Sequence, residues 1–355
     1  MRHQDSSGRV RDAVVWAGCA VLLTGVIAAC GSSNSGTAKQ ASSSQPASTW
    51  TDAILAPKGD AGFEYMAQAR GYYKQQGVDV SIKPFNGDVE MVQALVSGAI
   101  DSAEVAPAGV YRAVLKGAHL KIIGATIATQ TEDIYSKASI ANLNDLVGKA
   151  FAASAPNSFP EIITEAMMVS KGIKPDFKLV SAGSASQRIQ GMYSGKFDAT
   201  AAGAQFAAKV KKNPKFHVLA QSQDVVPQYP RLMIVTTEQA LKNKPKAAVK
   251  FLAAEIEGLR YAVSHPQTEI TLAAQKSGVS ANNPGVAYLN KLITDAHAVA
   301  TDGKAPVDKL QWLENFLVKY HFINGNVDIN KLVDDSYRQR ALKLISPATG
   351  TAPTK

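Results

Sequence analysis

From about residue 50 onward, short apolar runs alternate with longer stretches in which apolar residues recur at helical spacing. Residues 78–82 alternate apolar and polar side chains with a period of two, which is typical of a half-exposed strand. Residues 63–73 and 89–96 have the spacing of amphipathic helices, and Gly77 and Gly98 follow them as left-handed helix stops. This strand–helix order predicts an α/β fold whose sheets are mainly parallel and covered by helices.

The same order restarts near Lys149, and the second half of the chain repeats parts of the first. Ser97-Gly98-Ala99-Ile100-Asp101 parallels Ser194-Gly195-Lys196-Phe197-Asp198, and Gln76-Gly77-Val78 parallels Lys171-Gly172-Ile173. Helix–glycine–strand junctions recur in any α/β protein, but the shared Ser-Gly-x-apolar-Asp string favours two related lobes.

The pattern becomes mainly helical after a strand at 228–235, with predicted helices at 245–263, 269–277, 287–300 and 307–321. A lobe that is interrupted by a second lobe and then resumes explains this order. We predict lobe I at residues 50–130 and 228–345 and lobe II at 131–227, with crossings near 126–136 and 222–232. Two such connections allow the lobes to hinge over a ligand cleft.

The first thirty residues have the pattern of a secretory signal. A polar start with three arginines precedes an uncharged apolar run at 13–29, and small residues stand directly before Cys30. We predict a signal peptide at 1–29, a flexible Ser/Gly-rich tether at 30–49 and a disordered tail at 346–355. An uncleaved anchor with an incidental Cys30 is the alternative.

Composition and charge exclude several classes of protein. The chain is 46% hydrophobic and 19% charged, too apolar for a disordered protein and too mixed for a polytopic membrane protein. Two cysteines exclude a disulfide scaffold and a multi-cysteine zinc site. The net charge of +9 falls to +8 if the signal is removed, and most lysines fall on predicted helices. We interpret this surplus as a property of the surface, without nucleic-acid binding or a specifically anionic ligand.

The chain carries no convincing catalytic or cofactor motif. It has no phosphate-binding G-x-x-x-x-G-K-[ST] string, no G-x-G-x-x-G string and no H-E-x-x-H string, and its histidines are scattered. We predict no enzyme activity, no cofactor and no metal site.

Polar loops follow the predicted strands, and in open α/β sheets ligands bind at the carboxyl ends of strands. Ser158-Phe159-Pro160-Glu161 fits a capping box at the start of a helix, where free amides hold an anion or the helix is simply capped. The candidate ligand contacts in these loops are Lys58, Asp60, Phe63, Asn86, Glu104, Gln130, Ser154, Asn157, Ser158 and Gln205.

The chain from Asp52 to about Leu344 resembles substrate-binding proteins of ABC transporters, of the nitrate/sulfonate/taurine and thiamine-pyrimidine type. The strings that carry the resemblance are Gly71-Tyr72-Tyr73, Gln76-Gly77-Val78-Asp79-Val80, Ala94-Leu95-Val96-Ser97-Gly98-Ala99-Ile100-Asp101, Leu143-Asn144-Asp145-Leu146-Val147-Gly148-Lys149, Ser194-Gly195-Lys196-Phe197-Asp198-Ala199 and Leu332-Val333-Asp334-Asp335-Ser336-Tyr337. The residues before Cys30 also resemble a bacterial lipobox, which implies a lipid anchor at that cysteine.

This resemblance implies a two-lobed periplasmic-binding-protein-like fold of type II. It also implies an extracytoplasmic, lipid-anchored monomer that captures a small organic solute by hinge closure and delivers it to an ABC permease. The chain departs from the sulfonate type at Ser154–Ser158, where that type often has a Gly/Ser-rich loop, and at Gly203-Ala204-Gln205, where many members carry Trp-Asp/Glu-Pro. A heterocyclic nutrient such as a thiamine pyrimidine, or presentation of the ligand to a membrane sensor, are the alternatives. The cysteine-rich motif of pyrimidine synthases is absent.

Overall fold

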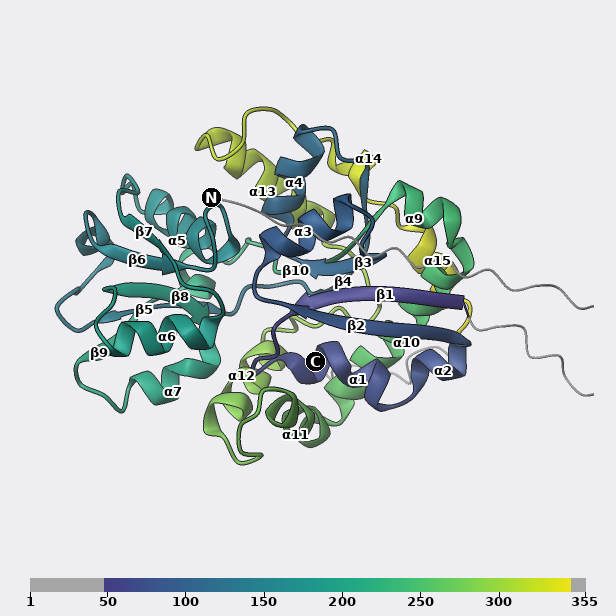
Figure 1. Cartoon of the computed structure of the whole chain (residues 1–355), viewed down its shortest axis with the longest axis horizontal. Helices are drawn as coiled ribbons and strands as arrows, with labels where there is room; N and C mark the ends of the chain where they lie inside the picture. The colour runs from purple at the N-terminus through teal and green to yellow at the C-terminus, as the bar shows by residue number, and fades with distance from the viewer. Residues whose placement is uncertain (1–47, 346–355) are drawn as a thin grey trace, which may run out of the picture. The chain divides into compact units, whose positions relative to one another are not determined.

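The computed structural model describes residues 48–345, whose main strands form two five-stranded sheets (Figure 1). The first sheet has the order β2-β1-β3-β10-β4, from strands β1 (Ser48–Leu55), β2 (Val78–Phe85), β3 (Ser102–Val105), β4 (Leu120–Ile127) and β10 (Leu232–Thr237). The second has the order β7-β6-β8-β5-β9, from β5 (Glu132–Lys137), β6 (Ala150–Ala153), β7 (Lys178–Ser181), β8 (Ala199–Gly203) and β9 (Phe216–Gln221). We call each sheet with its helices lobe I and lobe II, respectively.

Several sequence predictions fall outside the described residues. These are the signal segment 1–29, Cys30, nearly all of the tether and the tail 346–355; β1 itself begins at Ser48, within the predicted tether. The predicted lobe boundaries stay a prediction, although the chain passes from β4 of the first sheet to β5 of the second and returns before β10.

Both sheets are mixed, so the prediction of mainly parallel sheets holds only in part: four strands of each sheet share one direction and the fifth runs against them. In lobe I, β10 lies antiparallel to β3 and β4, and in lobe II, β5 lies antiparallel to β8 and β9. Each of these antiparallel strands directly follows a crossing between the lobes. It therefore enters its sheet from the end at which the parallel strands finish.

Helices cover both faces of the first sheet (Figure 1). Its helices are α1 (Ala61–Ala69), α2 (Tyr72–Gln76), α3 (Asp88–Val96), α4 (Pro107–Leu115), α9 (Glu238–Asn243), α10 (Pro245–Ser264), α11 (Pro266–Lys276), α12 (Pro284–Asp295), α13 (Val307–Lys319), α14 (Ile329–Leu332) and α15 (Ser336–Leu342). The helix predicted at 63–73 is in fact two, because Gly71 adopts a left-handed φ of 72° between α1 and α2. No helix of residues 48–345 is long and apolar enough to cross a membrane.

Lobe II carries α5 (Phe159–Ser170), α6 (Ala185–Tyr193), α7 (Ala207–Val210) and α8 (Ser222–Val225), with single 3₁₀ turns η1 (Leu143–Leu146) and η2 (Ala204–Phe206). Its core packs Phe151, Ile162, Ile163 and Met167 between the sheet and α5, all of them at most 1% exposed. Met167 is therefore a core residue of lobe II.

The internal repeat predicted from the sequence has a structural counterpart. Asp101 accepts a hydrogen bond from the backbone N–H of Thr51 at 2.8 Å, and Asp198 accepts one from Ala150 at 3.0 Å. In each lobe the aspartate therefore ties the start of one strand to the strand beside it. Gly98 and Gly195, three residues earlier, both have the left-handed φ that ends the preceding helix.

Four carboxyl groups are buried together in lobe I, on β1, α1, β3 and α10. Asp52 accepts a hydrogen bond from Ser102 at 2.5 Å and Glu255 accepts one from Tyr73, whereas neither oxygen of Glu64 or Glu104 has a partner among the described residues. Burial, reinforced for Glu64 by the charge of Asp60, raises the pKa of Asp52 to about 7 and that of Glu64 to about 8. Burial and mutual repulsion raise the pKa of Glu104 and of Glu255 well above the usual range.

These raised pKa values predict that the protein loses stability as the pH rises from about 5 to about 8. In this range the folded protein still holds protons that the unfolded chain has already released, since an unfolded glutamate titrates near 4.3. Glu64→Gln should remove on the order of 2 kcal/mol of this pH dependence. Chemical denaturation between pH 5 and pH 8 measures it, and Glu90→Gln on the exposed side of α3 is the control. Equal pH profiles of the wild type and Glu64→Gln would contradict the prediction.

The two lobes touch on both sides of the crossing segments. On one side the backbone N–H of Phe159 donates to Asp88 at 3.0 Å, and Arg112 donates to the carbonyl oxygen of Asn157 at 3.0 Å. On the other side α12 packs against η2 so closely that a Cβ on Gly285 would overlap the carbonyl oxygen of Gln205. The absence of a side chain at Gly285 is therefore a condition of this contact.

Gly285→Ala should push the lobes apart on the α12 side. Overpacking against a backbone atom costs about 1–3 kcal/mol, which shifts the balance toward separated lobes by about tenfold or more. Small-angle X-ray scattering should record a larger radius of gyration. Gly109→Ala is the matched control, because a Cβ there meets its nearest atoms, on Asp88 and Val92, at an ordinary 3.7 Å. A Gly285→Ala protein as compact as this control would refute the prediction.

Candidate functional site

A cavity of about 50 Å³ lies between the lobes, where the strands of the first sheet end. Lobe I contributes the residues that follow β1 and β2, and lobe II contributes residues that follow β6 and the starts of α5 and α6. The side chains and backbone that line it belong to Leu55, Ala56, Lys58, Asn86, Gly87, Asp88, Glu132, Ser154, Phe159, Pro160, Ser184, Ala185, Arg188 and Arg231. The site is therefore built from both lobes and from the segment that returns between them.

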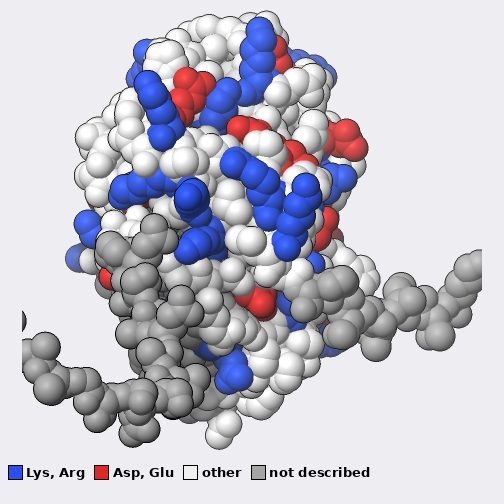
Figure 2. All heavy atoms as spheres, turned by 90° about the vertical axis from the view of Figure 1, so that its right-hand side faces the viewer, with Lys and Arg blue, Asp and Glu red and all other residues white. Residues whose placement is uncertain are grey.

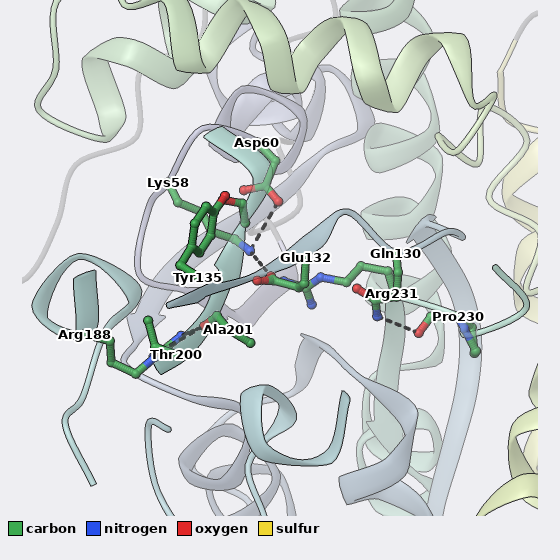
Figure 3. A network of polar contacts seen from close by, with 11 residues as sticks. Lys58, Asp60, Gln130, Glu132, Tyr135, Arg188, Thr200, Ala201, Pro230 and Arg231 are labelled. Carbon is green, nitrogen blue, oxygen red and sulfur yellow. Dashed lines mark hydrogen bonds and ion pairs between the residues drawn. The ribbon is translucent and has the colours of Figure 1, made fainter. Parts of the chain in front are cut away.

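The carboxylate of Glu132, at the start of β5, stands at the centre of this site (Figure 3). Its Oε1 lies 3.2 Å from Nζ of Lys58 in lobe I and 3.4 Å from Nη2 of Arg231 on the returning segment. Lys58 also lies 3.5 Å from Asp60. Burial alone would raise the pKa of Glu132, but the charges of Lys58 and Arg231 outweigh it and hold the pKa below its usual value. Glu132 is consequently ionised at neutral pH.

Arg231 is almost completely buried, with 1% of its surface exposed. Its guanidinium lies over the ring of Phe159, with Cζ 4.9 Å from the ring centroid. Besides the contact of Nη2 with Glu132, Nε and Nη1 have no hydrogen-bond partner among the described residues. A buried guanidinium with two unpartnered nitrogens leaves donor capacity at the wall of the cavity.

Arg188 of α6 is also buried, but it is held only by neutral groups. Its nitrogens donate to Thr200 Oγ1 at 3.1 Å, to the Gly183 carbonyl at 2.6 Å and to the Ala201 carbonyl at 2.9 Å (Figure 3). No carboxylate of the described residues lies within ion-pair distance of it. Burial lowers the pKa of Arg188 to about 10, so it keeps its charge at neutral pH.

The first turns of three helices also face the cavity, at Asp88 of α3, Phe159 of α5 and Ala185 of α6. Helix N-termini carry partial positive charge, which adds to that of the arginines. Asp88 offsets part of it by accepting the first N–H of α5. Burial raises the pKa of Asp88 despite that hydrogen bond.

Of the ten residues predicted to contact ligand, the structure brings Lys58, Asn86 and Ser154 together at the cavity. Gln130 lies on the crossing segment, fully buried, and its amide donates to the carbonyl of Pro230 at 3.1 Å on the other crossing (Figure 3). Asp60 reaches the site only through Lys58. Gln205 lines a separate groove between the lobes of about 380 Å³, which Lys58 also borders.

The other four residues do not line the cavity. Phe63 packs in the core of lobe I with Met66 and Leu259, and Glu104 belongs to the buried carboxyl cluster. Asn157 has a left-handed φ of 61° and lies at a surface groove beside α3 and α4. Ser158 is the N-cap residue of α5 and is fully buried. Their role in binding stays a prediction.

The predicted capping box is wrong in its details. The Ser158 side chain makes no capping hydrogen bond to the helix and instead accepts one from the N–H of Ala155 at 3.3 Å. Glu161 reaches back to the N–H of Asn157, one residue before the cap. The N–H of Glu161, which a capping box would direct to the Ser158 side chain, instead donates to the Ser158 backbone carbonyl at 3.2 Å, while Asp88 of lobe I accepts the first N–H of the helix.

Sequence reasoning missed Glu132, Arg188 and Arg231. Glu132 lay inside a predicted crossing, and Arg231 inside a predicted strand, where Leu232 to Val235 dominate the pattern. A usable signal was present in Arg188, a lone arginine on the buried face of α6 beside Ile189 and Met192. Charged residues on an otherwise apolar face are costly unless paired or functional.

Comparisons with known proteins concern the family and the fold of this chain. A family model described as "NMT1/THI5 like" matches residues 59–269. The chain is 20% identical over 283 residues to "Putative binding protein YtlA" of Bacillus subtilis (strain 168), covering 78% of this chain and 84% of that protein.

Solved structures share the fold. The periplasmic nitrate-binding protein NrtA from Synechocystis PCC 6803 superposes with a TM-score of 0.71 at 13% identity, over 87% of this chain and 92% of that one. The desulfurization enzyme DSZB superposes with a TM-score of 0.58 at 13% identity, over 84% of this chain and 99% of that one. The architecture is thus the two-lobed fold of periplasmic binding proteins, and by the family match the chain belongs to the NMT1/THI5-like family.

Proposed function

We propose that this protein is the solute-binding component of an ABC import system and that it captures a small solute carrying an anionic group between its two lobes. The observation that carries the proposal is the pair of buried arginines at the cavity. Arg188 has no carboxylate partner among the described residues, and Arg231 has two unpartnered nitrogens. An anion supplies both missing interactions at once.

The charges at the cavity wall support an anionic solute group. Lys58, Arg188 and Arg231 carry three positive charges, against which Glu132 and Asp88 are the acidic residues of the wall. Lys58 and one nitrogen of Arg231 are already engaged by Glu132. The positive charge that Glu132 leaves unpaired therefore lies on Arg188 and on the side of Arg231 turned away from Glu132. This favours an anionic ligand, which the net charge of the sequence alone did not indicate.

The size of the cavity limits the group that it holds. A water molecule needs about 10–15 Å³ of such volume, so 50 Å³ accommodates roughly three to five non-hydrogen atoms. A nitrate ion or the head of a sulfonate or of taurine is of this size. A larger solute places its remainder in the groove lined by Gln205 and Phe206, which Lys58 joins to the cavity.

Capture requires that the lobes open and close, and the two crossing segments are suited to act as the hinge. Gln130 and Pro230 join these segments by a hydrogen bond, so that they bend together. We further propose that the protein is a monomer without a cofactor, held outside the bacterial cell membrane by a lipid on Cys30, and that it delivers its solute to an ABC permease.

A heterocyclic nutrient is the second candidate, and one observation favours it. Both polar atoms of the Gln205 side-chain amide are buried without a partner among the described residues, and Phe206 stands beside it in the groove. An amide and an aromatic ring are what recognition of a nitrogen heterocycle needs. The anionic head remains the first choice, because Arg188 lacks a carboxylate partner and Arg231 has two unpartnered nitrogens among the described residues.

A thermal-shift screen of the chain from Cys30 onward tests the proposal. Nitrate, alkanesulfonates, taurine, pyrimidines and flavins are added in turn, and a ligand at 100 times its Kd stabilises the folded state by about 2.7 kcal/mol. We expect stabilisation by at least one anion. No stabilisation by any small solute would refute solute capture, and stabilisation by neutral heterocycles alone would favour the second candidate.

Arg231→Gln should weaken binding of the anion about 10- to 100-fold, because it removes a charge-assisted hydrogen bond worth about 1.5–3 kcal/mol. Isothermal titration with the solute found in the screen measures the loss, and thermal unfolding without solute confirms that the variant folds. Arg70→Ala is the control, since Arg70 is exposed on α1's end and stacks on Tyr261. Unchanged affinity in Arg231→Gln would remove Arg231 from the site.

A further inference from the structure

The chain enters lobe I at the end of the strands that lies opposite the cavity. β1 begins at Ser48 beside Val78, the first residue of β2, whereas its last residue, Leu55, lines the cavity. Ser48 and Thr49 share a surface groove with Lys244 and Lys246, at the start of α10. Whatever precedes Ser48 therefore leaves this fold beside lysines, at the far end of lobe I from the solute.

Basic side chains gather around this entry point (Figure 2). Lys250 of α10 donates to the Gly77 carbonyl beside β2, and Tyr337 of α15 donates to the Leu241 carbonyl in α9, which brings α15 to the same end. We call this surface the basic pole and define it as Lys74, Lys242, Lys244, Lys246, Lys250, Arg340 and Lys343.

Acidic groups also lie on the elements of the basic pole (Figure 2): Glu238 at the start of α9 pairs with Lys121 at 3.2 Å, and Asp335 before α15 pairs with Arg338 at 2.5 Å. Lys244 pairs with Asp101 at 2.8 Å, and Asp79 is exposed near the start of β2. The exposed Lys242, Lys246 and Lys343 form no ion pair with any described residue. Leu344, next to Lys343, is 51% exposed. The pole is thus a positively charged surface with an apolar residue at its margin.

We infer that the basic pole docks on anionic phospholipid headgroups, so that this end of lobe I rests on the membrane surface. This rests on the proposed lipid anchor at Cys30, which lies 18 residues before Ser48 in the sequence. A random coil of that length has an end-to-end distance of roughly 25 Å, so an anchor at Cys30 would hold the pole near the membrane surface. At that range each lysine close to the headgroups gains from the negative surface potential within a Debye length of about 8–10 Å.

The side-chain chemistry favours lipid over protein or nucleic acid as the partner. Six of the seven cations are lysines, which act as point charges on flexible stems and need no fixed geometry in their counter-ions. A fluid array of headgroups supplies such charges. A nucleic-acid surface would be expected to add exposed aromatic rings for stacking, whereas Tyr337 at this end is partly buried and lies under the Arg340 guanidinium, 4.1 Å from its ring centroid.

Vesicle binding tests the inference with the chain from residue 30 carrying Cys30→Ser, so that no acyl group contributes. We expect binding to phosphatidylcholine vesicles containing about one-third phosphatidylglycerol, little binding to pure phosphatidylcholine, and release in about 0.5 M NaCl. The double variant Lys242→Glu/Lys246→Glu should bind at least tenfold more weakly.

The matched control is Lys171→Glu/Lys174→Glu, which changes net charge equally on exposed residues of lobe II. It should stay within twofold of the parent. Equal binding to both vesicle types, or equal loss in both double variants, would overturn the inference, as would binding to an isolated permease without binding to lipid. Thermal shifts with the solute are measured on the same samples. They show whether each variant still binds solute, independently of whether it binds lipid.

Discussion

The ion contacts around Glu132 join three parts of the chain at the site. Lys58 comes from lobe I, Glu132 from lobe II, and Arg231 from the segment that returns between them. All three side chains are at most 10% exposed. Removing Glu132 would leave the buried Arg231 without its ion-pair partner, and such a loss commonly costs about 3–5 kcal/mol. The relative position of the lobes at the cavity therefore depends on this triad.

The two arginines of the cavity are held in different ways. Arg188 is fixed within lobe II by three hydrogen bonds to its own lobe, so its charge is pre-organised and moves only with that lobe. Arg231 belongs to a crossing segment and shares Glu132 with Lys58. An anion that contacts both would connect a rigid element to the hinge. This difference provides a physical route by which occupancy of the cavity influences the angle between the lobes.

Local rules allowed much of the fold to be predicted from sequence. Gly77, Gly98, Gly172 and Gly195 all adopt the left-handed conformation expected of helix stops, because that requirement is set within a few residues. The α/β class followed from periodicity in the same way, and the fold comparison confirms it. The split between α1 and α2 at Gly71 was missed because the apolar spacing continues across it.

The site was harder to predict because its chemistry depends on contacts distant in sequence. Phe63 and Glu104 stand beside strand ends, as ligand contacts should, but neighbouring helices cover them. Glu132 and Arg231 are 99 residues apart and become partners only when the chain crosses twice. The start of α5 likewise involves a distant residue, since Asp88, 71 residues from Phe159, accepts the first N–H of the helix. The pattern of apolar and polar residues within a short stretch of sequence carries no information about such long-range contacts.

Because of the position of β10, the first sheet can be completed only late in the synthesis of the chain. β10 lies between β3 and β4, which are therefore not neighbours, and β10 follows the whole of lobe II in the chain. Until residues 232–237 have been made, β3 and β4 each keep an unpaired edge, and such edges invite association with other chains. The strands of lobe II, β5 to β9, follow one another in the chain, so its sheet does not depend on a segment that is synthesised much later. A ribosome-bound chain thus carries a lobe I whose sheet is still incomplete, and its open strand edges are prone to aggregation until β10 has been made.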